Sequence, residues 1–134
     1  MAVDGWLVDN SAAARLSEPA LGTQLAALSG RLFVCPMGEL EQLYSARSAR
    51  DYDERKALLH AGFRAVAAPH DVLDRALLLQ RDLAHHHGMW HRTPIPDLVI
   101  AETALFHNLG VVHVDGDFSR IAAVRPLEAR RLGS

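Results

Sequence analysis

Short apolar runs separated by helical stretches constrain this chain more than any other feature of its sequence. Residues 6–8, 32–35 and 111–114 have the length and the apolar content of buried strands. Between them, apolar residues recur at helical spacing, most clearly over residues 71–87, where the stretch ends at Gly88. Strands that alternate with helices predict an α/β fold, a sandwich with a central, mostly parallel sheet flanked by helices.

The remaining pattern predicts weaker elements and a single domain. We expect helices near 12–16, 20–28, 37–47, 51–60, 96–108 and 119–123, with short strands in 63–68 and 124–127 and a loop over 89–95. The chain has 134 residues and no linker-like stretch, so residues 1–134 are expected to form one domain.

Composition narrows the setting in which the chain works. Cys35 is the only cysteine, no apolar run approaches the ~18 residues that span a bilayer, and the first residues lack a secretory pattern. We therefore expect a cytoplasmic protein with no membrane partner. The net charge of −2 argues against a strongly basic nucleic-acid scaffold, but it leaves nucleic-acid enzymes open because local fields decide where a polyanion docks.

Acidic residues follow two of the predicted strands. Asp9 comes directly after the first apolar run, and Asp115 after the last, with Asp117 two residues further on. In open α/β sheets, ligands bind beyond the carboxyl ends of the strands. These aspartates are therefore candidates for one shared site.

Two further acids lie in the first turns of predicted helices. Glu39 borders the apolar face of its helix, whereas Glu41 points to nearly the opposite side. Asp97 shares a helix face with Ala101 and Ala104, whose small side chains favour close packing. A carboxylate at the edge of a buried face needs a partner, which makes Glu39 and Asp97 further candidates.

Gathered carboxylates repel one another unless a cation neutralises them, and oxygen ligands suit Mg²⁺ or Mn²⁺. Ser11 adds a hydroxyl close to Asp9. Each acid also has a plainer interpretation: Asp9 and Asp97 as helix N-terminal carboxylates, residues 115–117 as a turn, and Glu39 as a half-exposed helical residue. The spaced set argues for a site more strongly than any one member.

Four segments, in this order and spacing, resemble a PIN domain, and within that group the VapC toxins. They are Val-Asp-Asn-Ser-Ala at 8–12, Gly-Glu-Leu-Glu-Gln-Leu-Tyr-Ser-Ala-Arg at 38–47, Pro-Asp-Leu-Val-Ile-Ala-Glu-Thr-Ala at 96–104 and His-Val-Asp-Gly-Asp-Phe at 113–118. The resemblance implies a PIN-like sandwich and an Mg²⁺- or Mn²⁺-dependent endoribonuclease that acts as the toxin of a bacterial toxin–antitoxin pair.

By position, the resemblance assigns roles to individual residues. The catalytic acids correspond to Asp9, Glu39, Asp97 and Asp115, and the metal ligands to Asp9, Asp97, Asp115 and Asp117. Ser11 matches a supporting hydroxyl. We expect loss of cleavage when Asp9 or Asp97 becomes Asn, and much smaller effects from changes at Glu41 or Glu102.

The resemblance also implies partners. These are an RNA substrate (tRNA, rRNA or mRNA), a cognate VapB-type antitoxin, and a second copy of the chain in a homodimer that forms a heterotetramer or larger assembly with the antitoxin. His91 and Arg92 precede Asp97 and are candidates for RNA contact. The particular RNA, the antitoxin, and whether one or two ions serve catalysis stay open.

Other classes fit less well. Receiver domains and haloacid-dehalogenase-type phosphatases need a lysine at a late strand end, and the only lysine is Lys56, inside a helix. The three histidines 85–87 fan out about 100° apart on a helix and cannot all face one metal ion. A catalytically inactive PIN domain that binds protein or RNA, and a DNA nuclease with the same acids, remain the alternatives.

Overall fold

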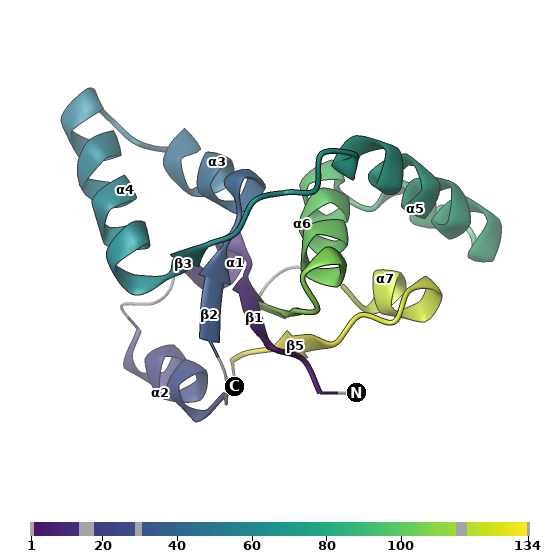
Figure 1. Cartoon of the computed structure of the whole chain (residues 1–134), viewed down its shortest axis with the longest axis horizontal. Coiled ribbons are helices and arrows are strands. Elements are labelled where there is room, and N and C mark those ends of the chain that lie inside the picture. The colour runs from purple at the N-terminus through teal and green to yellow at the C-terminus, as the bar shows by residue number, and fades with distance from the viewer. Residues whose placement is uncertain (1, 14–17, 29–30, 115–117, 134) are drawn as a thin grey trace.

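The computed structural model describes residues 2–13, 18–28, 31–114 and 118–133. Within them, five strands form one sheet whose order is β3-β2-β1-β4-β5 (Figure 1). The strands are β1 (Gly5–Val8), β2 (Arg31–Val34), β3 (Arg64–Ala65), β4 (Gly110–His113) and β5 (Ala129–Arg131). Every pairing between them is parallel, which confirms the predicted α/β class.

Helices connect these strands and cover both faces of the sheet (Figure 1). They are α1 (Asn10–Ala13), α2 (Pro19–Ala27), α3 (Pro36–Tyr44), α4 (Ala49–Gly62), α5 (Val72–His86), the 3₁₀ helix η1 (Trp90–Arg92), α6 (Ile95–Phe106) and α7 (Ser119–Val124). A proline stands in the first turn of α2, α3 and α6, where its missing N–H costs no helical hydrogen bond. The Ser48 side chain caps α4 by accepting from the Asp51 N–H.

The strand order creates a switch point between β1 and β4. From β1 the chain builds outward through β2 and β3, and then returns to the other side of β1 with β4 and β5. Connections on the two sides of the switch therefore leave the sheet in opposite directions. A crevice forms at such a point beyond the carboxyl ends of the two central strands.

Side chains of the central strands alternate between two cores. Leu7 and Val111 enter the core shared with α5, α6 and α7. Trp6, Val8 and Val112 enter the core on the opposite face, which α2, α3 and α4 help to close. All four residues of β1 and of β4 are buried, so the sheet is covered on both faces at its centre.

One glycine permits the close packing of β1 on β4. A Cβ atom at Gly110 would lie 2.5 Å from Cζ3 of the Trp6 ring and 2.9 Å from the Glu128 carbonyl oxygen. Trp6 and Gly110 are direct partners in the β1–β4 register. No other residue fits at position 110 without displacing the indole.

The structure corrects three predicted boundaries. The strand predicted over 124–127 is wrong: Val124 ends α7, Pro126 has no N–H to offer a sheet, and β5 begins at Ala129. The predicted loop over 89–95 contains η1. The predicted strand over 63–68 shrinks to β3, because only Arg64 and Ala65 pair with β2.

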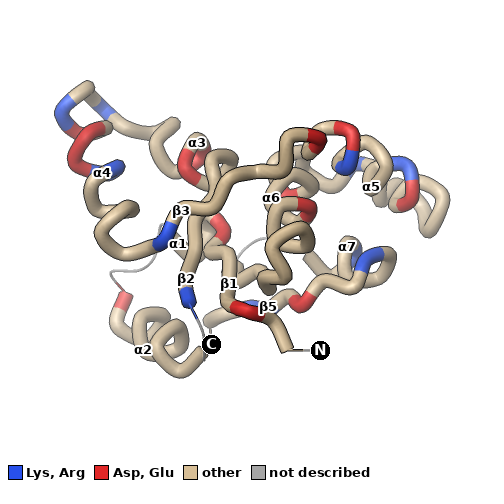
Figure 2. Tube along the Cα trace, in the orientation of Figure 1, with Lys and Arg blue, Asp and Glu red and all other residues tan. Residues whose placement is uncertain are grey.

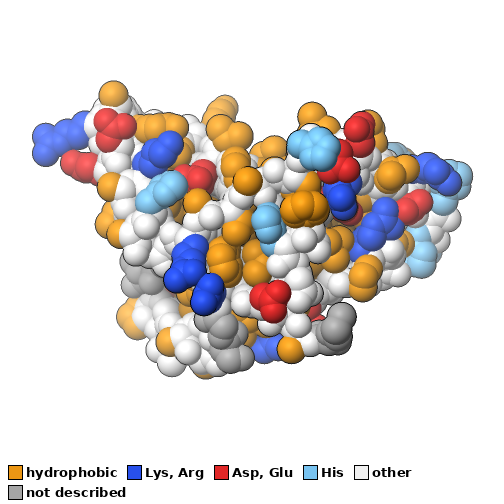
Figure 3. Space-filling model, viewed as in Figure 1, with side chains coloured by type: hydrophobic (Ala, Val, Ile, Leu, Met, Phe, Trp, Pro, Cys, Tyr) orange, Lys and Arg blue, Asp and Glu red, His pale blue; other side chains and the backbone are white. Residues whose placement is uncertain are grey.

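Among the described residues, no helix has the length and apolar character needed to cross a membrane. Helix α5 is amphipathic instead: it buries Ala76, Leu79 and Leu83 and leaves Leu73 and Leu77 exposed. Hydrophobic side chains of this kind are visible at the surface among charged ones (Figure 3).

Replacing Leu79 by Ala tests the packing of α5. Leu79 is fully buried, so Leu79→Ala should lower the free energy of unfolding by about 2–5 kcal/mol through the lost transfer energy and the cavity. Leu77 lies on the same helix but is 63% exposed, and Leu77→Ala should change the free energy of unfolding by less than about 0.5 kcal/mol. Urea unfolding measures both values, and equal losses would contradict this account of α5.

Candidate active site

Asp9 lies at the switch point, directly after β1. Its N–H donates to the Val112 carbonyl of β4 at 2.9 Å, which extends the parallel ladder by one residue. Asp9 is buried, with only 4% of its surface exposed. The Asp9 carboxylate is thus fixed at the carboxyl end of the central strand pair, the position predicted from the sequence.

Ser11 ties this carboxylate to the end of β4. The Ser11 hydroxyl donates to Asp9 Oδ2 at 2.8 Å, and the Ser11 N–H donates to the same oxygen at 3.2 Å. The Val114 N–H in turn donates to Ser11 Oγ at 2.9 Å. One hydroxyl therefore orients Asp9 and also holds the backbone just before residue 115.

Helix α3 brings two glutamates toward this region on different faces. A Cβ atom at Gly38 would lie 3.9 Å from the Val8 carbonyl oxygen, so this face of α3 packs on the carboxyl end of β1. Glu41 follows Gly38 by three residues and therefore lies on the same face. Glu39 lies about 100° away around the helix.

Glu41 faces a low-polarity environment that also contains a negative charge. Burial raises the pKa of the Glu41 carboxyl, and the charge of Asp9 raises it further. Its Oε1 atom is buried and, within the part of the chain that the structure describes, accepts no hydrogen bond. Helical spacing separates Glu41 from Glu39, but it does not indicate which of the two lies close enough to Asp9 for its charge to act.

Glu39 has a partner on the neighbouring helix. Its Oε1 atom lies 2.6 Å from His60 Nε2 of α4. The Glu39 side chain is 15% exposed, against 43% for His60. The partner that a carboxylate at a buried edge was expected to need is thus a histidine from α4.

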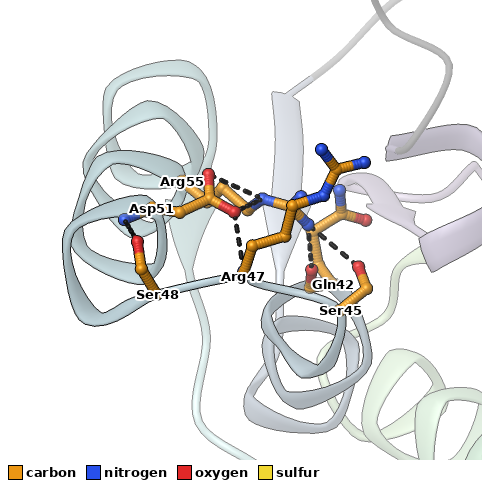
Figure 4. A network of polar contacts seen from close by, with 6 residues as sticks. All are labelled: Gln42, Ser45, Arg47, Ser48, Asp51 and Arg55. Carbon is orange, nitrogen blue, oxygen red and sulfur yellow. Dashed lines mark hydrogen bonds and ion pairs between the residues drawn. The ribbon is translucent and has the colours of Figure 1, made fainter.

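A polar network holds α4 against the end of α3 (Figure 4). Arg55 donates to Ser45 Oγ at 2.9 Å and to the Gln42 carbonyl at 3.5 Å, and it pairs with Asp51 at 3.3 Å. Asp51 also accepts from the Arg47 N–H at 2.9 Å, and these contacts lower the pKa of its carboxyl. The network fixes one end of α4, and the contact between His60 and Glu39 lies near the other.

Asp97 is placed by α6, the most buried helix of the fold. It lies in the first turn and is partly exposed, while Ala101 and Ala104 behind it are fully buried. Helix α6 contacts α3, β1 and β4, so it borders the same end of the sheet. Figure 2 shows acidic positions on both α3 and α6.

Glu102 is a structural residue rather than a solvent-exposed acid. It is 5% exposed, and its Oε2 lies 3.5 Å from Arg125 Nε, while Arg125 also pairs with Asp82 at 2.8 Å. Burial raises the pKa of Glu102, and the charge of Arg125 opposes that rise. The small effect expected for a change at Glu102 is therefore unsafe as a control, because replacing Glu102 would remove an ion-pair partner of Arg125.

Two predicted site residues, Asp115 and Asp117, lie outside the described residues. Among the rest, no three His, Cys, Asp or Glu side chains come together as a ligand group. The described portion therefore places Asp9 at the switch point with Ser11, and Glu41 close enough for the charge of Asp9 to act on it. The complete predicted quartet is not tested.

The other candidates have ordinary surroundings. Trp90 contacts the rings of His86 and His87, and Arg120 lies over its indole. His91 and Arg92, the proposed RNA contacts, follow Trp90 in η1. His91 is partly buried, and Arg92 is exposed. Cys35 is buried with its pKa raised by desolvation, as expected of a core thiol.

Comparison with known proteins adds independent findings. A family model described as the PIN domain matches residues 6–124. The chain is 55% identical to Ribonuclease VapC17 of Mycobacterium tuberculosis (strain H37Rv) over 90% of both chains. It is 39% identical to Ribonuclease VapC18 of the same strain, over 89% of this chain and 88% of that one.

The fold has solved counterparts. The structure of VapBC2 from Rickettsia felis, bound to a DNA fragment from its promoter, contains a chain that superposes with a TM-score of 0.75 at 12% identity. The match covers 95% of this chain and 98% of the other. The sheet order, the acidic switch point and these matches define the class, and the chain belongs to the PIN-domain family, among the VapC ribonucleases.

Replacing Ser11 by Ala tests the link between the strand ends. Ser11→Ala removes the hydroxyl that serves Asp9 and leaves the buried Val114 N–H without this acceptor, so the free energy of unfolding should fall by about 1–3 kcal/mol. Ser45→Ala is the matched control, because the Ser45 hydroxyl is exposed and Arg55 keeps Asp51; we expect a change below about 0.5 kcal/mol. Thermal unfolding of the two variants decides, and a neutral Ser11→Ala would refute the role of the hydroxyl.

Proposed function

We propose that this chain is a metal-dependent endoribonuclease, the toxin of a bacterial toxin–antitoxin pair. The observation that carries the proposal is the buried Asp9 carboxylate at the switch point, oriented by Ser11 beside the end of β4. Membership among the VapC ribonucleases supports the assignment of RNA as the substrate. The proposed catalytic acids are Asp9, Glu39, Asp97 and Asp115.

The residues present suit a hard divalent cation. A buried carboxylate requires compensation, and within the described residues no arginine or lysine forms an ion pair with Asp9. A second buried carboxylate oxygen, Glu41 Oε1, is also without a partner there. Oxygen donors of this kind favour Mg²⁺ or Mn²⁺, held in our proposal by Asp9, Asp97, Asp115 and Asp117.

When bound, the ion would supply an activated water and neutralise charge on the phosphate. The side chains of this chain have three further tasks in the reaction. Ser11 holds Asp9 in one orientation, because its hydroxyl donates to the Asp9 carboxylate and accepts from the Val114 N–H. In the proposal, Asp97 contributes its carboxylate from α6 and Glu39 from α3, and His91 and Arg92 of η1 contact the RNA.

The proposal includes the partners and the setting of the chain. VapC-type chains in the solved complexes occur with VapB-type antitoxins, and we propose the same arrangement here, with a homodimer of this chain at its centre. A cognate antitoxin would cover the acids and suppress cleavage. We also propose a cytoplasmic location, where RNA is accessible.

Cleavage of RNA by the purified chain is the decisive measurement. With Mg²⁺ or Mn²⁺, total bacterial RNA should be cut at discrete positions, and EDTA should stop cutting. Asp9→Asn and Asp97→Asn should reduce the rate at least about a hundredfold, since even outer partners of metal ligands contribute about 10–100-fold. The fold should persist, because each change removes a negative charge from a group of acids.

Glu128→Gln is the matched control for the charge change. Glu128 lies just before β5, beside Gly110 at the amino end of β4. Asp9 lies at the carboxyl ends of the strands, so the two acids are at opposite ends of the sheet. Its side chain is exposed, and the distance to its ion-pair partner Arg130 is 3.8 Å. Full activity of this variant beside inactive Asp9 and Asp97 variants would support the site. A folded wild-type chain that cuts no RNA under any condition would refute the nuclease and favour an inactive, binding PIN domain.

A further inference from the structure

Strands β2 and β3, at one edge of the sheet, carry two arginines on the same face. In the β2–β3 register, Arg64 is the partner of Phe33, and Arg31 lies two residues before Phe33. Side chains at alternate positions of a strand point to one face, and residues paired across strands share that face. Arg31 and Arg64 therefore project from the same face as near neighbours.

The end of α4 completes a hollow around these two arginines. The hollow has a volume of about 420 Å³ and is lined by residues 31–32 of β2 and residues 60–64, where α4 leads into β3. Figure 3 shows Lys or Arg side chains over β2 and β3, with a histidine above them towards α4. Lys56 lies one turn before His60 on α4. Figure 2 accordingly shows positively charged positions on α4, β3 and β2 along this side of the molecule.

The cations around this hollow are not neutralised by acids. Arg31, Arg64 and Lys56 are exposed, and within the described part of the chain none of them forms an ion pair. Arg50 and Arg75, by contrast, each pair with an acid four residues away. A chain with a net charge of −2 thus carries a locally positive surface here, and such a surface attracts a polyanion.

His60 connects the hollow with the proposed active site. It lines the hollow, and its Nε2 atom lies 2.6 Å from Oε1 of Glu39. Glu39 is one of the proposed catalytic acids. One side chain therefore separates the positively charged hollow from the acids that are proposed to cut RNA.

We propose that Arg31 and Arg64 bind backbone phosphates of the RNA substrate beside the proposed cleavage site, with Lys56 extending the positive surface along α4. The planar guanidinium of arginine suits phosphate oxygens because it can donate two parallel hydrogen bonds. Contacts to phosphates position a nucleic acid without reading its sequence. The two arginines are thus binding residues outside the catalytic acids. The inference rests on the proposed function, which makes RNA the substrate.

The salt dependence of RNA binding by the purified full chain tests this proposal. Fluorescence anisotropy of a labelled single-stranded oligoribonucleotide, in EDTA and over a range of NaCl concentrations, measures the association constant without cleavage. Each lost phosphate contact should reduce the slope of log K against log [NaCl] by about 0.7, so Arg31→Gln/Arg64→Gln should reduce it by about 1.4. Arg31→Lys/Arg64→Lys keeps both charges and should keep the wild-type slope.

Arg81→Gln is the matched control for the single variant Arg64→Gln. Arg81 lies on α5, is exposed and has no ion pair within the described residues. Its replacement should leave the slope unchanged, whereas Arg64→Gln should reduce it by about 0.7. Equal reductions by the two variants would indicate a general effect of charge and would overturn the proposal.

Thermal unfolding separates binding from a structural role. The arginines stand near the carboxyl end of α4, whose dipole a cation stabilises. Because both side chains are exposed, the double Gln variant should unfold at the wild-type midpoint. A lower midpoint with an unchanged salt slope would assign the arginines to the stability of α4 and contradict the proposal.

Failure of the proposed nuclease gives a different result. A wild-type chain that binds RNA with the expected slopes but cuts none in Mg²⁺ or Mn²⁺ would refute the nuclease and leave RNA binding by the arginines standing. A chain that cuts RNA, beside a double Gln variant with the wild-type slope, would overturn the role of the arginines alone. No binding of the oligoribonucleotide by the folded wild-type chain would overturn it as well.

Discussion

The parallel pairing of β1 with strands on both of its sides is the constraint on which the rest of the structure depends. All of β1 is buried, so its backbone groups have no water to bind and must be satisfied by β2 and β4. The pairing fixes where β1 ends, and so where Asp9 begins. Because the chain order reverses at the β1–β4 boundary, the same pairing puts Asp9 at the switch point, where open α/β sheets bind their ligands.

The helices around this switch point are held in two different ways. Helices α5 and α6 pack through fully buried apolar side chains such as Leu79, Leu83 and Leu98. In helix α4, Leu59 is the buried residue, and the polar contacts with α3 come from Arg55 and His60. The acid on α6 therefore sits on a well-packed support, while Glu39 depends on polar contacts with a more exposed helix.

Much of the fold and part of the site followed from the sequence. Short apolar runs with helices between them predicted the parallel sheet, and strand-end aspartates predicted the position of Asp9. The faces of α3 were harder to assign: helical spacing separates Glu39 from Glu41, but it does not say which neighbour each face meets. Glu102 was misjudged for the same reason, since the ion pair that accounts for its burial comes from Arg125, distant in sequence. The strand predicted at 124–127 moved because Pro126 cannot donate to β4.

The contact between Trp6 and Gly110 has a consequence far from where it occurs. A slip of one residue between β1 and β4 would bring the side chain of Val111 against the indole and turn every β4 side chain toward the wrong core. The absence of a side chain at position 110 therefore selects one alignment of the two strands. With a rise of about 3.3 Å per residue, that selection is made about 10 Å from the strand ends. A glycine with no chemistry of its own thus sets the level at which Asp9 and Ser11 meet the end of β4.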